Sequence, residues 1–137
     1  MFKQSQIKNP TRSLKEVVKA ANRVTTKGHV LMYTSGLAVP GTSSTTVANL
    51  IGICNEAITA EQALTQVPVI EVFQNDVWLA DSTNNSNAAH TGQKMVLGAN
   101  AGVVNNSGTT DADGVVQQVG VYGAAADRKI LVRFLTA

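Results

Sequence analysis

From Gly28 to the end of the chain, short apolar runs alternate with segments rich in Gly, Asn, Asp and Ser. The apolar runs fall at 29–33, 37–39, 47–54, 67–73, 77–80, 94–97, 103–104, 115–122 and 130–135. Turn-forming residues close these runs, as at 34–36 and 74–76. Eight or nine short strands about ten residues apart are typical of a sandwich or barrel rather than of alternating strands and helices. The pattern predicts an all-β fold, either a small β-barrel or a β-sandwich.

Residues 14–27 support two interpretations. Apolar side chains recur there at helical spacing, at Leu14, Val17, Val18, Ala21 and Val24. Ser13–Glu16 also fits a capping box, so the local pattern favours a helix. The competing interpretation is a strand over 17–21, a turn at 22–23 and a second strand after Gly28. Residues 1–13 are polar, contain Pro10 and lack periodicity, which predicts an irregular, extended arm.

Positive charge is concentrated at the N-terminus. Seven of the eleven Lys and Arg residues lie in the first 27 positions: Lys3, Lys8, Arg12, Lys15, Lys19, Arg23 and Lys27. With one acid among them these residues carry +6, whereas four basic and eight acidic residues give the remaining 110 a charge of −4. We therefore divide the chain into a basic arm at 1–27 and a β-barrel or β-sandwich body at 28–137. Such an asymmetry indicates an end that docks on a negative surface.

Composition limits the remaining choices. A chain of 137 residues is the size of one domain, and with 4% aromatic residues its core must consist largely of Val, Leu, Ile and Ala. Cys54 is the only cysteine, so no intrachain disulfide can form and a buried thiol is expected. No apolar run approaches the ~18 residues of a membrane span, and no apolar stretch follows the first charges as in a signal peptide. We expect no membrane partner.

The residues that could take part in catalysis or metal binding are far apart in the sequence and do not form a motif. His29, His90 and Cys54 lie in no recognisable motif, so a catalytic pair is not expected. Residues 111–114 resemble the start of a calcium loop but lack the further oxygen ligand and the final Glu, which favours a turn. The polar loop at 84–87 and the glycines of 98–102 likewise form no complete metal or phosphate motif. The sequence predicts no enzyme, no cofactor and no metal site.

Two features are candidates for docking. The arm would offer Phe2, Lys3, Ile7, Lys8, Arg12 and Lys15 to a partner. Surface ion pairs contribute only ~0–1 kcal/mol each, so apolar side chains of the arm must be buried as well. An acidic protein surface fits the arm better than nucleic acid, because the acidic body would repel phosphates and only Phe2 could stack on a base. Trp78 follows the turn at 74–76 and so lies near the end of a hairpin. A core position is the alternative, but we predict Trp78 to be the apolar anchor of a capsid or subunit interface.

Four segments together resemble the small decoration, or cement, proteins of tailed-bacteriophage heads. They are Thr26–Tyr33 with its continuation to Val39, Leu50–Ala60, Val67–Val72 with Asp76–Asp81, and Lys129–Phe134. Their motifs are a Gly-led strand, a Gly-Ile/Val-x-x-x-Ala-Ile turn and a terminal Val-Arg-Phe strand. The resemblance covers roughly residues 17–137. It implies a small β-barrel or β-sandwich and favours a strand before Gly28.

The resemblance also implies a structural role. A protein of this class binds the major capsid protein on the outer surface of an icosahedral head and stabilises the shell, and it can contact neighbouring copies of itself. It would be made in the host cytoplasm and end on the outside of the virion. The alternative class is a receptor- or carbohydrate-binding β-module of a virion, which would normally expose clustered aromatic side chains.

Overall fold

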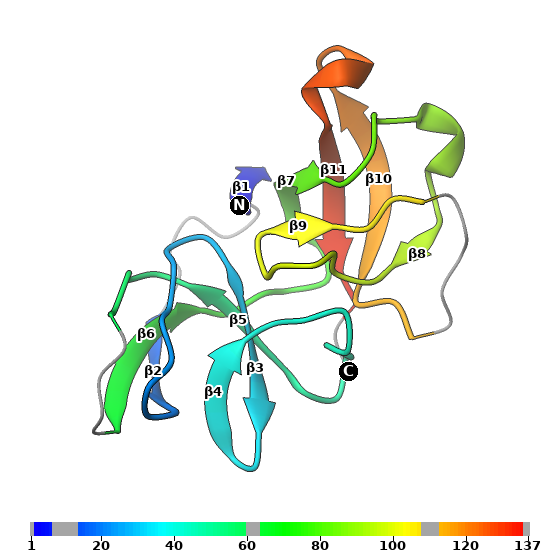
Figure 1. The fold of residues 1–137 in the computed structure, drawn as a ribbon. Coiled ribbons are helices and arrows are strands. Elements are labelled where there is room, and N and C mark those ends of the chain that lie inside the picture. The colour runs from blue at the N-terminus through cyan, green and yellow to red at the C-terminus, as the bar shows by residue number, and fades with distance from the viewer. Residues whose placement is uncertain (1, 7–13, 60–63, 108–112, 136–137) are drawn as a thin grey trace.

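The computed structural model describes residues 2–6, 14–59, 64–107 and 113–135, which form strands joined by turns and two short 3-10 helices (Figure 1). The strands are β1 (Lys3–Gln6), β2 (Leu14–Lys19), β3 (Val30–Thr34), β4 (Leu37–Pro40), β5 (Leu50–Cys54), β6 (Thr65–Ile70), β7 (Val77–Ser82), β8 (Lys94–Met95), β9 (Val103–Val104), β10 (Val116–Tyr122) and β11 (Lys129–Phe134). The 3-10 helices are η1 (Ala88–His90) and η2 (Ala125–Asp127). No helix in these ranges has the length and hydropathy needed to cross a membrane.

Strands β2 to β6 form a closed barrel in the order β2-β4-β3-β5-β6. Antiparallel pairs make up most of it, and a parallel contact between Lys19 and Ala38 joins β2 to β4. One cluster of buried side chains fills its interior: Val17, Leu31, Ala38, Ile51, Cys54, Val67 and Val69. These are small or branched residues, which suit the narrow interior of a barrel with few strands.

The second part is a sheet in the order β1-β7-β11-β10-β8, with β9 pairing parallel to β7. Between this sheet and the barrel lies a shared core. The sheet supplies Trp78, Ala80, Ile130, Val132 and Phe134, among others, and the barrel supplies Val30 and Ile53. Buried apolar area is the main stabilising term in folding, so a core common to both parts holds them as one body.

Gly52 allows β5 to face both cores. Leu31 pairs with Gly52 and Met32 pairs with Leu50, so Ile51 is the extra residue of a β-bulge. After this bulge, Ile53 packs in the shared core while Cys54 turns into the barrel. A Cβ atom on Gly52 would lie 2.4 Å from the carbonyl oxygen of Ile70, so only glycine fits.

The all-β prediction is confirmed, and every apolar run predicted as a strand after Gly28 contains or overlaps one. Over 14–27 the helix favoured by the local pattern is wrong. Residues 14–19 form strand β2, whose whole length pairs with β6. The boundary predicted at 27/28 must also be corrected, because β2 is a wall of the barrel and not part of a separate arm.

The start of the chain also belongs to the body. Strand β1 was not predicted; it pairs antiparallel with β7, with Lys3 opposite Leu79 and Gln4 opposite Trp78. The backbone N–H of Phe2 donates to the carbonyl of Gly28 at 2.7 Å. The described part of the N-terminal segment is therefore an edge of the second sheet.

Candidate docking surface

The outer face of the β2–β6 ribbon exposes apolar side chains. Side chains in a strand alternate between faces, and in β2 the outward positions are Leu14, Glu16 and Val18. Leu14 is 50% exposed and Val18 is 38% exposed. Across the ribbon, Pro68 pairs with Glu16 and Gln66 pairs with Val18. The two strands therefore present a common outer surface.

Leu64 extends this surface. It directly precedes β6, one position beyond the pair of Lys19 with Thr65, and is 59% exposed. We define the β2–β6 face as Leu14, Glu16, Val18, Leu64, Gln66 and Pro68. Strands β2 and β6 lie on the flank of the barrel away from the second sheet (Figure 1). Period-two spacing in 14–18 and 64–68 is the signal that could have located it in the sequence.

The cations of the same segment do not share this face. Lys15 is opposite Val69, a residue of the barrel interior, and is half-buried. Lys19 is fully buried, and its ammonium donates to the carbonyl of Ala20 at 2.9 Å. The basic stripe that a helix would have formed is therefore replaced by an outward surface that is largely apolar.

Phe2 is not available to a partner. It is 3% exposed, and its ring lies 5.3 Å from that of Phe134 in the shared core. This corrects its prediction as a docking residue, since a side chain that completes the core cannot also bind another protein. Lys3 lies in β1. The predicted docking residues Ile7, Lys8 and Arg12 lie outside the described residues.

Trp78 is also a core residue, which contradicts its prediction as an interface anchor. It is 2% exposed and meets Phe134 edge-on at 6.0 Å. The alternation of β7 explains the placement, because Trp78 and Ala80 point into the shared core while Val77 and Leu79 are half-buried on the other face. The turn before β7 is present, with the N–H of Asp76 donating to the carbonyl of Phe73 at 3.0 Å.

Charged groups gather around Asp81 in β7. Lys129, its cross-strand neighbour, forms an ion pair with it. Burial alone would raise the pKa of Asp81, but favourable interactions led by the hydrogen bond from Lys129 outweigh burial, and the pKa lies below its usual value. Burial lowers the pKa of His29 from its ordinary value of 6.5, and the nearby Asp81 carboxylate opposes part of this change.

The side chains of Cys54 and His29, the other reactive groups, form no hydrogen bond with each other in the described part of the chain. The thiol of Cys54 is buried and donates to the carbonyl of Glu56 at 2.9 Å, as expected for an inert core cysteine. The ring of His29 lies against Gly102, where a Cβ atom would be 2.5 Å from Nε2. Across the described ranges, no three His, Cys, Asp or Glu side chains come together as a possible metal site.

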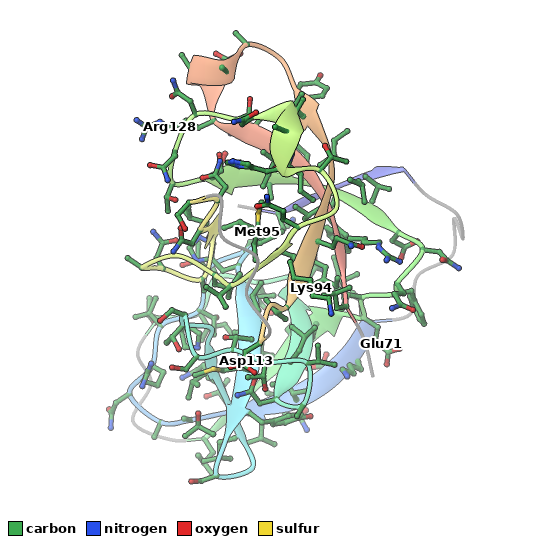
Figure 2. All side chains as sticks on the ribbon, turned by 90° about the vertical axis from the view of Figure 1, so that its right-hand side faces the viewer. Glu71, Lys94, Met95, Asp113 and Arg128 are labelled. Carbon is green, nitrogen blue, oxygen red and sulfur yellow. The ribbon has the colours of Figure 1, made fainter. Side chains whose placement is uncertain are left out.

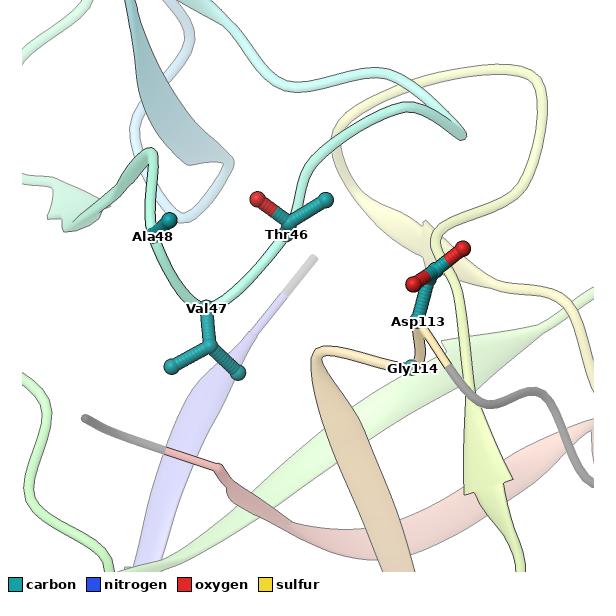
Figure 3. A pocket seen from close by; sticks show the side chains of 5 residues that line it. All are labelled: Thr46, Val47, Ala48, Asp113 and Gly114. Atoms are coloured by element: carbon teal, nitrogen blue, oxygen red, sulfur yellow. The ribbon is translucent and has the colours of Figure 1, made fainter.

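A small pocket of about 180 Å³ lies where the β4–β5 loop approaches the segment before β10 (Figure 3). Its lining is Thr46, Val47, Ala48, Asp113 and Gly114. Figure 2 places Asp113 at the level of the barrel and Arg128 at the distant end of the second sheet. The pocket thus offers one carboxylate and one hydroxyl beside methyl groups. Asp113 belongs to the segment predicted as a turn, of which 111–112 lie outside the described residues.

Comparison with known proteins adds no relative, because neither a protein-family model nor a curated protein sequence matches this chain. Any function assigned to the chain therefore rests on its own residues and geometry.

Proposed function

We propose that the chain is a decoration protein that binds the outer surface of an icosahedral bacteriophage head and stabilises it. The observation that carries the proposal is the β2–β6 face, an apolar surface on the wall of a closed barrel. Exposed apolar patches on a soluble domain mark interaction sites. The four sequence segments that resemble phage decoration proteins support the same class.

The partner is a capsid protein with a basic or hydrogen-bond-donating group inside an apolar surface. Glu16 lies between Leu14 and Val18, in the middle of the β2–β6 face. Two copies packed about a two-fold axis through this face would bring the two Glu16 carboxylates together, which is unfavourable. A different protein can place a cation there, so the face fits a shell subunit better than a second copy.

The energetics suit a repetitive lattice. Fully burying one Val or Leu side chain contributes about 1.5–3 kcal/mol to binding, whereas association costs roughly 4–15 kcal/mol in lost translational and rotational entropy. Leu14, Val18 and Leu64 therefore support only modest binding by one copy. A protein that binds the assembled shell in preference to free subunits stabilises it by mass action, and many equivalent sites multiply the effect.

The test measures co-sedimentation of the purified chain with heads that lack it. Val18→Lys and Leu64→Lys each remove apolar contact and add charge, so each should weaken binding at least about tenfold, the equivalent of ~1.4 kcal/mol. Val24→Lys is the matched control, because Val24 is 55% exposed but lies outside the β2–β6 face. Equal binding by all four proteins would reject the face as the docking surface.

A receptor- or carbohydrate-binding module is the alternative function. Such a module stacks its ligand on exposed aromatic rings, and Tyr122 and Tyr33 are 57% and 42% exposed. They lie in β10 and β3, which belong to different sheets. Binding to host-surface glycans that Tyr122→Ser abolishes, without binding to heads, would favour this alternative.

A further inference from the structure

The second sheet has an outer face, turned away from the shared core, on which side chains form three rows. Residues directly opposite each other in paired strands point to the same face, so the strand register gives these rows. The first row is Asp81, Lys129 and Tyr122, and the second is Leu79, Leu131 and Gly120. The third row is Arg133, Gln117 and Lys94. The alternate positions of β7 and β11 fill the shared core, so all three rows lie on the opposite face.

The middle row is an apolar strip between two polar rows. Residues on one face of a strand are two positions apart, so neighbouring rows are separated by ~6–7 Å. In the first row Asp81 and Lys129 form an ion pair, and Tyr122 beside them is 57% exposed. In the third row Nε of Arg133 donates to Oε1 of Gln117 at 2.8 Å. The outer face therefore combines a strip of C–H groups with hydrogen-bonding groups on both sides.

Gly120 lies in this strip, and the fold itself does not require a glycine there. Its φ is not positive, and the nearest atom to a Cβ at this position would be Cδ1 of Leu131 at 3.7 Å, an ordinary contact. The extra residue of the bulge in β10 is Val119, not Gly120. Every other glycine in the described part of the chain has a positive φ or a Cβ position within 3.0 Å of another atom. A strand glycine without an internal cause indicates that a ligand approaches the backbone closely.

The third row is cationic. Lys94 is exposed, Arg133 is half-buried, and both flank Gln117 across the sheet. No ion pair joins either cation to an acid within the described ranges. A complementary ligand therefore brings an anionic group to the third row and a flat, apolar surface to the strip. An acidic sugar has both, because its ring carries C–H groups on its faces and its carboxylate can pair with a guanidinium.

We propose that the outer face of the second sheet binds an acidic polysaccharide, with a sugar ring against Tyr122 and Gly120 and carboxylates at Arg133 and Lys94. An acidic peptide would meet the same cations, but its backbone has no flat ring to lie on the strip beside Tyr122. This activity goes beyond head decoration and is compatible with it. Strands β2 and β6 lie on the far flank of the barrel, so a copy docked through the β2–β6 face would leave the outer face free (Figure 1).

The experiment measures binding of the free, full chain to three polymers by titration calorimetry: oligogalacturonate, dextran and polyglutamate. Dextran has sugar rings without carboxylates, and polyglutamate has carboxylates without sugar rings. We expect oligogalacturonate to bind at least about tenfold more tightly than either, because it alone supplies both the ring and the charge-assisted hydrogen bonds.

Three variants locate the site. Gly120→Val covers the strip, Tyr122→Ser removes the exposed ring and Arg133→Gln removes a cation, so each should weaken oligogalacturonate binding about tenfold. The melting temperature of Gly120→Val should stay normal, because a Cβ has room at this position. If that variant does melt early, Tyr122→Ser and Arg133→Gln decide. Tyr33→Ser is the matched control, since Tyr33 is 42% exposed but lies in β3 of the barrel.

The proposal is overturned by any of three results: no binding of oligogalacturonate, equal binding of dextran or polyglutamate, or equal binding by the unmodified chain and the outer-face variants. Equal binding of polyglutamate would assign the face to an acidic peptide instead. The proposed head decoration fails separately, because Val18→Lys should bind oligogalacturonate normally and Tyr122→Ser should co-sediment with heads normally.

Discussion

Three of the six aromatic residues of the chain meet in one cluster. The rings of Phe2 and Trp78 both pack on Phe134, so the residue before β1 and one side chain from β7 each contact a side chain of β11. In a chain whose core is otherwise aliphatic, these rings bury the largest apolar areas. Their loss should be more damaging than that of any one valine.

Trp78→Ala should lower the free energy of unfolding by about 3–5 kcal/mol, because it leaves a large cavity in the shared core. Trp78→Phe should cost less, since it keeps a ring and removes the buried Nε1–H, which has no partner. Chemical denaturation monitored by circular dichroism measures both. A normal midpoint for the alanine variant would mean that Trp78 is not in the core.

Stability should fall as the pH drops below about 6.5, and His29 should account for part of the fall. Because the pKa of His29 is lowered in the fold, the unfolded chain binds the proton more readily. The unfolded state then gains protons first on acidification, so the contribution of His29 is complete above pH 6.5 and is lost below it.

His29→Asn should flatten this part of the stability profile in denaturation measured between pH 7 and 5. The lowered pKa of Asp81 acts in a more acidic range, where protonation of the carboxylate ends its pairing with Lys129. An unchanged slope between pH 7 and 5 in the His29 variant would contradict the assignment.

At the scale of elements, β2 shows how periodicity misleads. Leu14, Val17 and Val18 fit a helical stripe, yet the strand buries Val17 and exposes the other two. A short window cannot separate the helical period of 3.6 from the strand period of 2. Residues 14–19 become a strand because they pair with β6, which lies some fifty residues later in the chain. Leu14 and Val18, the exposed apolar residues that β2 contributes to the β2–β6 face, fitted the helical pattern for the same reason.

The strands after Gly28 were predictable because their apolar runs are bounded by turn residues such as 34–36 and 74–76. Strand β1 was not, because Lys-Gln-Ser-Gln has no apolar alternation and owes its conformation to the edge of β7. The inward direction of Trp78 also escaped prediction, since period two alone does not say which face of a strand is covered.

At the scale of the whole molecule, the barrel and the second sheet depend on each other through the shared core. Deleting residues 1–6 should therefore destabilise the protein, by at least the ~3–5 kcal/mol expected for losing Phe2. Thermal unfolding followed by circular dichroism measures the effect, and Phe2→Leu should be milder because it keeps an apolar side chain. An unchanged melting temperature in the truncated chain would instead restore the interpretation of a detachable arm.

The pairing of β1 with β7 has a consequence for synthesis of the chain. The ribosome releases β1 first, but its partner strand, β7, appears only after the whole barrel has been made. The barrel strands β2 to β6 can pair while the chain is still being synthesised, whereas β1 stays unpaired until β7 has emerged. A bulky fusion at the N-terminus would act on that last step, and would leave a finished barrel attached to an open sheet.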